Sequence, residues 1–207
     1  MANKMITAVI NGKTITAESG STILQAARAN NIHIPTLCDH PSLPPSGACR
    51  VCLVEVEKNP KLLTSCTTPL TEGMVVTTNS PRVLAARKAV VEMLLIRHPL
   101  DCFSCESNGR CELQNLAYEL GIEKSPFTDE GDVCTHFELD NTNPFFIRDM
   151  NKCILCGRCV RACDWRAGYH AIDFQFRGIH TQINPPIGTK LEDEASDCVF
   201  CGQCVQV

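Results

Sequence analysis

Two stretches of sequence decide the fold: 153-CILCGRCVRAC-163 and 198-CVFCGQC-204. Both contain Cys-x2-Cys-Gly-x-Cys, and they flank a predicted hairpin formed by Ala171–Phe176 and His180–Ile183 around Gly178. One motif that recurs across a hairpin indicates an internal duplication. Three cysteines at successive three-residue steps fit one corner of a cubane iron–sulfur cluster and match no zinc-finger spacing. The two stretches therefore predict a pair of [4Fe–4S] sites.

The first stretch follows C-x2-C-x2-C-x3-C, the spacing of two-cluster ferredoxins, whose fourth cysteine binds the other cluster. By that rule, Cys163 does not bind the cluster of its own stretch. It is instead the fourth ligand of the cluster bound by Cys198, Cys201 and Cys204 in the second stretch. The sister site holds Cys153, Cys156 and Cys159, and its fourth ligand is expected at position 208. The sequence ends at Val207, so we expect either a longer native chain or a cluster that lacks a fourth protein thiolate.

Cysteine content sets the class of the protein, since 15 of 207 residues are cysteine. A net charge of -4 and the lack of basic runs argue against nucleic acid, and no apolar stretch is long enough to span a membrane. The N-terminus, MANKMITAVING, does not have the pattern of a secretory signal. A cytoplasmic location follows as an expectation, and reduced cysteines there favour metal ligation over disulfides.

Another set of cysteines lies upstream, with the pattern Cys38-x10-Cys49-x2-Cys52-x13-Cys66. Four thiolates with one tight inner pair can hold a [2Fe–2S] cluster on a loop beside a sheet. The plant-type pattern has four residues between its first two cysteines, whereas this chain has ten. Gly47 allows the backbone to approach the cluster closely. The alternative is a four-cysteine zinc site, but such sites usually pair two Cys-x2-Cys knuckles and this set has one.

The segments around this set predict a small mixed sheet wrapped over one helix. Asn11-Gly12 is a strong hairpin signal, and Ser21 is the expected N-cap of a helix that runs to Asn30. The expected strands are Met5–Ile10, Lys13–Ala17, Val51–Val56 and Met74–Thr78.

A further ligand set follows a predicted helix that is capped by Ser80, begins at Pro81 and ends at Arg97. Its members are His98, Cys102, Cys105 and Cys111. Three cysteines fall one short of the four ligands of a cubane, and His98 lies where the fourth is needed. The alternative role for His98 is that of a helix-terminal histidine that interacts with the macrodipole. A second helix is expected over Cys111–Leu120, with Gly121 as its left-handed cap, and Cys134 has no assigned partner.

The order and spacing of these sets resemble the N-terminal part of the large iron–sulfur subunit of complex I. They also resemble the N-terminal arms of [FeFe] hydrogenases and NAD(P)-linked formate dehydrogenases, and diaphorase-type iron–sulfur subunits. The stretch FIRDMNKCILCGRCVRACD is especially similar to the hydrogenase and formate dehydrogenase arms.

The resemblance implies an α+β chain with three cluster domains. These are a β-grasp [2Fe–2S] ferredoxin domain (1–79), a small helical domain with one histidine and three cysteine ligands (80–121) and a two-cluster ferredoxin-like domain (146–207). A linker (122–145) joins the second domain to the third. The cofactors would be one [2Fe–2S] and three [4Fe–4S] clusters, one of which lacks its fourth protein ligand within residues 1–207.

The expected function is electron relay between a flavin- and NAD(P)-binding subunit and a second redox subunit or domain. No G-x-G-x-x-G, hydrogenase cluster cradle or catalytic domain occurs in the sequence, so no substrate site is expected in this chain. Two alternatives stay open. One is the N-terminal electron-transfer arm of a longer catalytic subunit, a hydrogenase or formate dehydrogenase. The other is a zinc-rich interaction scaffold, in which zinc would replace iron and sulfide.

Overall fold

The computed structural model describes residues 4–123 and 136–207, which fall into two compact units. Of the described residues, the first unit comprises 4–39, Pro45–Val91 and Gly109–Glu123. The second unit comprises His40–Pro44, Glu92–Asn108 and 136–207. Cys134 and residues 124–135 of the expected linker lie outside the described residues.

The first unit contains a five-stranded mixed sheet with the order β2-β1-β5-β3-β4. Strands β1 and β5 are parallel, and the other pairs are antiparallel. The strands are β1 (Met5–Ile10), β2 (Lys13–Glu18), β3 (Leu53–Val56), β4 (Leu63–Thr64) and β5 (Val75–Thr77). The predicted hairpin is confirmed: Ile10 pairs with Lys13 across Asn11 and Gly12, which both have positive φ, as a two-residue primed turn requires.

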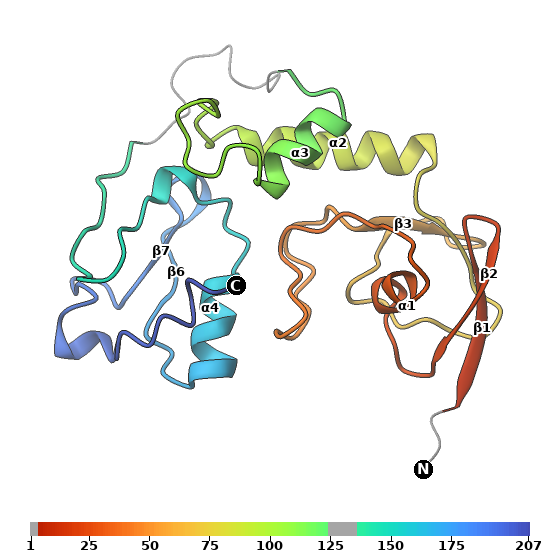
Figure 1. The fold of residues 1–207 in the computed structure, drawn as a ribbon, viewed down its shortest axis with the longest axis horizontal. Coiled ribbons are helices and arrows are strands. Elements are labelled where there is room, and N and C mark those ends of the chain that lie inside the picture. Colours follow the sequence, from red (N-terminus) through yellow and green to blue (C-terminus); the bar gives the residue numbers. More distant parts are fainter. Residues whose placement is uncertain (1–3, 124–135) are drawn as a thin grey trace. The chain divides into compact units, whose positions relative to one another are not determined.

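Helix α1 (Ile23–Ala29) packs against this sheet, as predicted (Figure 1). Alternate apolar residues of β1 and β2 join Ile23, Leu24 and Ala27 in one buried core. The predicted cap was wrong by one residue. Thr22, not Ser21, is the N-cap, because its hydroxyl and the Gln25 side chain form a reciprocal capping box.

Two other helices were predicted closely. Helix α2 (Pro81–Leu95) is capped by the Ser80 hydroxyl, which accepts from Val83 N–H at 3.1 Å, and it ends two residues before the predicted Arg97. Helix α3 (Glu112–Glu119) follows Cys111, and Gly121 has the expected left-handed conformation. Among the described residues, no helix combines the length and the apolar character needed to cross a bilayer.

The second unit is built on short elements around the two cysteine stretches (Figure 1). Strands β6 (Asp173–Gln175) and β7 (Gln182–Asn184) form the predicted hairpin; both are shorter than predicted, and β7 ends one residue beyond the predicted Ile183. Gly178–His180 forms a 3-10 turn between them. Helix α4 (Arg158–Arg161) continues into a π-helical turn, Ala162–Ala167. Short 3-10 helices cover Met150–Lys152 and Glu194–Ser196. The core gathers Val160, Cys163, Ile172, Ile183 and Leu191.

Candidate metal centres

The four upstream cysteines, Cys38, Cys49, Cys52 and Cys66, lie together in the first unit. The sulfurs of Cys52 and Cys66 are 3.4 Å apart, and Cys49 N–H donates to Cys38 Sγ at 3.5 Å. Cys52 and Cys66 belong to the buried core that also contains α1. Residues separated by 28 positions in the sequence therefore present their thiols to one place.

The pKa values of these thiols show how closely they approach one another. Hydrogen bonds from the thiols of Cys49 and Cys66 hold the pKa of Cys38 far below its ordinary value. The same contacts with Cys38 raise the pKa values of Cys49 and Cys66. The hydrogen bond with Cys66 lowers the pKa of Cys52 to about 6. Four thiolates this close repel one another, so their joint ionisation needs positive charge of the kind that bound iron supplies.

Local backbone geometry presents these thiols. Arg50, between Cys49 and Cys52, has a φ of 59°, so the chain turns there and β3 begins at Leu53 rather than at the predicted Val51. Gly47 has a φ of 65°, and a Cβ there would lie 3.2 Å from the Thr67 side chain. The backbone at Gly47 thus lies close to the Thr67 side chain, and its approach to a cluster stays a prediction.

The Cys66 loop is fixed from two sides. Ser65 N–H donates to the Cys52 carbonyl at 3.1 Å, and the Ser65 carbonyl accepts from Leu24 N–H at the start of α1 at 3.0 Å. The Ser65 hydroxyl is buried and acts on the Cys52 thiolate, whose pKa it helps to lower. A hydroxyl donor beside two cysteines fits a site that holds ligand thiolates.

The histidine set is divided between the two units. His98, Cys102 and Cys105 belong to the second unit, and Cys111 begins α3 in the first. Burial, followed by the charge of Lys152, lowers the pKa of His98 and so favours its neutral imidazole. Its Nδ1 atom is buried without a hydrogen-bond partner in the described part of the chain. A neutral ring with an orphaned nitrogen fits a metal ligand better than a charged helix cap.

The duplication predicted for the second unit is visible in the backbone. Leu155 and Phe200 occupy the same position within Cys-x2-Cys, with φ values of 55° and 54°. The glycines that follow the second cysteine, Gly157 and Gly202, have φ values of 68° and 69°. Two segments far apart in the sequence thus have the same loop conformation, in which the backbone turns sharply between and after the two cysteines of each Cys-x2-Cys pair.

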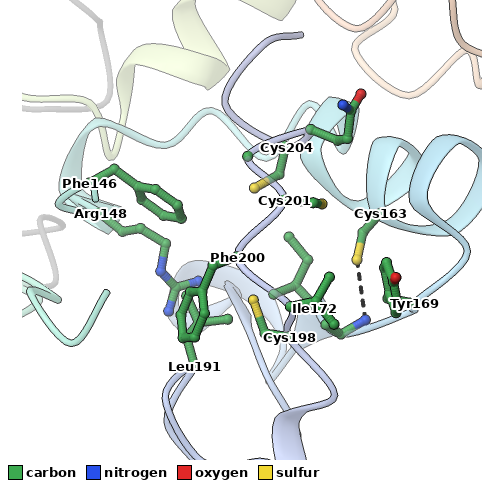
Figure 2. Close-up of a pocket in the computed structure, with 14 residues that line it drawn as sticks. Phe146, Arg148, Cys163, Tyr169, Ile172, Leu191, Cys198, Phe200, Cys201 and Cys204 are labelled. Carbon is green, nitrogen blue, oxygen red and sulfur yellow. Dashed lines mark hydrogen bonds between the residues drawn. The ribbon is translucent and has the colours of Figure 1, made fainter. Parts of the chain in front are cut away.

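Cys163 is grouped with the second stretch rather than with its own neighbours. Cys163, Cys198, Cys201 and Cys204 line one cavity (Figure 2), which Arg148 also borders. In the described part of the chain, that lining does not include Cys153, Cys156 or Cys159. Ala171 N–H donates to Cys163 Sγ at 3.2 Å, so the start of the hairpin fixes the thiol in place.

Burial is the main influence on the thiols of the second unit. It raises the pKa values of Cys153, Cys163 and Cys204, and it raises the pKa of Cys159 to about 12. Neighbouring sulfurs raise the pKa values further: Cys198 acts on Cys163, while Cys156, Cys153 and Cys204 act on Cys159. The influence of Cys204 on Cys159 shows that the two groups of thiols lie next to each other. In the described residues, no three His, Cys, Asp or Glu side chains surround a single metal-ion position.

Sequence reasoning missed two arginines at these sites. Arg148 borders the cavity and is held by Asp140 and by the Ile183 carbonyl at 3.0 Å. Arg87 is buried beside Cys52. Nothing in the spacing marks Arg148. Arg87, however, lies four residues from both Val83 and Val91, which are fully buried, so it interrupts the apolar face of α2.

Three family models match the chain: two cover one ligand set each, and the third covers both duplicated stretches. A 2Fe-2S iron-sulfur cluster binding domain matches residues 3–81, and an NADH-ubiquinone oxidoreductase-G iron-sulfur binding region matches residues 87–126. A 4Fe-4S dicluster domain matches residues 152–207.

The solved structure of an NAD⁺-reducing [NiFe]-hydrogenase in the H₂-reduced state aligns with a TM-score of 0.83. The two sequences are 32% identical, and the alignment covers 95% of this chain and 80% of that chain. The chain belongs to the iron–sulfur family shared by the large iron–sulfur subunit of complex I and NAD(P)-linked hydrogenases. The chain is an iron–sulfur electron-transfer module of this family, which confirms the resemblance predicted from the cysteine spacing.

Curated relatives in this family are longer than the chain. NADP-reducing hydrogenase subunit HndD from Solidesulfovibrio fructosivorans is 44% identical over 98% of this chain and 35% of its own length. The alpha subunit of an NADPH-Fe(3+) oxidoreductase from Geobacter sulfurreducens is 40% identical over 97% of this chain and 23% of its own length. The chain therefore spans about a third or less of these relatives.

Proposed function

We propose that this chain carries one [2Fe–2S] and three [4Fe–4S] clusters and relays electrons between a flavin- and NAD(P)-binding subunit and a second redox centre. Bound clusters would supply one-electron acceptor and donor sites; the protein's part is to hold and insulate them. The observation that carries the proposal is the cavity that Cys163 shares with Cys198, Cys201 and Cys204, since this grouping is the crossed arrangement of two-cluster ferredoxins.

The proposed ligands follow from the groups described above. Cys38, Cys49, Cys52 and Cys66 would hold the [2Fe–2S] cluster in a β-grasp domain (1–79). His98, Cys102, Cys105 and Cys111 would hold one [4Fe–4S] cluster in a helical domain (80–121). Residues 146–207 would hold the other two, one through the cavity cysteines and one through Cys153, Cys156 and Cys159.

Each group of residues has a separate task in this function. Buried Cys52 and Cys66 exclude water from the first centre. Backbone N–H groups such as that of Ala171 donate to the ligand sulfurs, and such hydrogen bonds raise reduction potentials. His98, held neutral by burial, would contribute no negative charge to its centre. A cytoplasmic location, in which thiols stay reduced, suits this chemistry.

Metal analysis and redox titration of protein purified without oxygen test the proposal. We expect iron and acid-labile sulfide, a rhombic [2Fe–2S] EPR signal and separate [4Fe–4S] signals on reduction. NADH or NADPH should reduce these centres only when a flavin subunit is added. Stoichiometric zinc without sulfide would contradict the proposal and support the scaffold hypothesis.

A second candidate is the electron-transfer arm of a longer catalytic chain, which the length of HndD and its relatives favours. Under this proposal the chain performs the same relay within one polypeptide. The intact mass of the natural product distinguishes the two: a mass near 22.7 kDa supports a separate subunit, and a much larger mass supports the arm.

A further inference from the structure

Arg87 occupies an unusual position for a cation. It lies on α2 within the first unit, and only 3% of its surface is exposed. Burial lowers the pKa of its guanidinium, which shows the cost of placing a charge there. A buried arginine normally persists only where its donors are satisfied and its charge is offset.

The hydrogen bonds of Arg87 surround Cys52. Its Nε donates to the Val51 carbonyl at 2.9 Å, and its Nη2 donates to the Leu53 carbonyl at 3.1 Å. Nη2 also donates to the Thr78 carbonyl at 3.1 Å. Arg87 therefore fixes the peptide group before Cys52 and the carbonyl of the next residue, Leu53, while the carbonyl of Cys52 itself accepts from Ser65 N–H.

Clamping these carbonyls also sets the direction of the amide groups. In a trans peptide, the carbonyl and the following N–H point in opposite directions. Because the Val51 carbonyl is turned toward Arg87, the N–H of Cys52 points away from the guanidinium. The side chain of Cys52 is thus presented from a backbone that has little freedom to rotate.

Arg87 also acts on Cys52 through its charge. Glu119 and the Cys52 thiolate are the charges that favour its protonated form, and Cys52 is a proposed cluster ligand. A buried cation favours the more negative, reduced state of a nearby redox centre, and low local polarity strengthens the effect. We propose that Arg87 positions Cys52 and raises the reduction potential of the centre that Cys52 helps to hold. This inference rests on the proposed function.

Redox titration of the rhombic EPR signal in full-length variants tests the role of the charge. Arg87→Gln removes the charge while keeping one donor. We expect its cluster to be reduced about tenfold less readily, a shift of ~59 mV to lower potential for a one-electron couple. Arg82→Gln is the matched control, because Arg82 lies on the same helix and its side chain is 54% exposed beside Glu55. Its potential should equal that of the wild type.

Arg87→Lys separates positioning from charge. It keeps the charge but cannot bridge the carbonyls as a planar fork does. We expect a wild-type potential together with faster bleaching of the cluster by an iron chelator. A wild-type bleaching rate would contradict the positioning role. If Arg87→Gln folds but loses the cluster altogether, that result supports the positioning role. The role of the charge is then tested by Arg87→Lys alone, and a lowered potential in that variant would contradict it.

The wild-type sample distinguishes failure of this inference from failure of the proposed function. A wild-type protein that lacks [2Fe–2S] would contradict both. A wild-type protein that holds the cluster, with equal potentials in Arg87→Gln and Arg82→Gln, would contradict the role of the charge alone. If the role of Arg87 were only structural, Arg87→Gln would lower the thermal stability of the protein and leave the reduction potential of the cluster unchanged.

Discussion

The upstream cysteine set and the duplicated stretches present thiols by different means. Cys38, Cys52 and Cys66 are at most 2% exposed, and Cys52 and Cys66 belong to the core formed by a sheet and a helix. Cys201, in contrast, is exposed, and the duplicated stretches depend on tight left-handed loops. The thiols of the first site thus come together only when the domain folds, whereas most thiols of the duplicated stretches are placed by the local conformation of a few residues. This difference explains why cysteine spacing predicts [4Fe–4S] sites in the duplicated stretches but leaves a zinc site as an alternative for the upstream set.

The largest effect is expected for Cys163→Ala, which tests whether the duplicated stretches exchange a ligand. Loss of this thiol should destroy or convert the [4Fe–4S] centre of Cys198, Cys201 and Cys204, because they share its cavity. Cys156→Ala is the matched control and should damage the other cubane. EPR spectra of the two reduced variants should lose different signals. If both lose the same one, the crossing is wrong.

Cys49→Ser tests the independence of the upstream site. Serine is a poorer iron ligand than a thiolate, so the rhombic [2Fe–2S] signal should disappear or change its g values. The cubane signals should persist, because their proposed ligands lie elsewhere in the chain. An unchanged rhombic signal would contradict the assignment of Cys49.

A smaller effect is expected for His98→Cys, which converts the mixed ligand set to the all-thiolate type. The cluster should be retained, and its midpoint potential should fall, because a thiolate adds a negative charge that a neutral imidazole lacks. Potentiometric EPR measures the shift. A titration identical to that of the wild type would mean that His98 is a helix-terminal residue only.

The smallest effect is expected on thermal stability, from a comparison of the same substitution in the two copies of the duplicated loop. Gly157→Ala and Gly202→Ala both place a side chain at positive φ, at a cost of about 1–2 kcal/mol. The new Cβ at position 157 would also lie 3.1 Å from the Phe174 ring, whereas none of the described atoms would lie within 4 Å at position 202. Thermal melts should therefore show a lower midpoint for Gly157→Ala. Equal midpoints would mean that Phe174 moves aside freely.

Local signals predicted much of this molecule. The Asn11-Gly12 hairpin, the Ser80 cap and the repeated Cys-x2-Cys-Gly loops depend on neighbouring residues, and the structure contains all of them. The cap of α1 was misassigned because Ser21 and Thr22 are both good caps, and only Thr22 pairs with Gln25. Arg87 could not be assigned to Cys52 from the sequence, because the carbonyls it binds lie up to 36 residues away and meet it only in the fold.

The central claim is that the cysteine groups hold iron–sulfur clusters, with ligands exchanged between the duplicated stretches. Anomalous diffraction at the iron edge, from crystals grown without oxygen, tests it most directly. We expect an iron pair beside Cys38, Cys49, Cys52 and Cys66, and a cubane bonded to Cys163 together with Cys198, Cys201 and Cys204. Iron that joins Cys163 to Cys153, Cys156 and Cys159, or zinc at the upstream site, would contradict it.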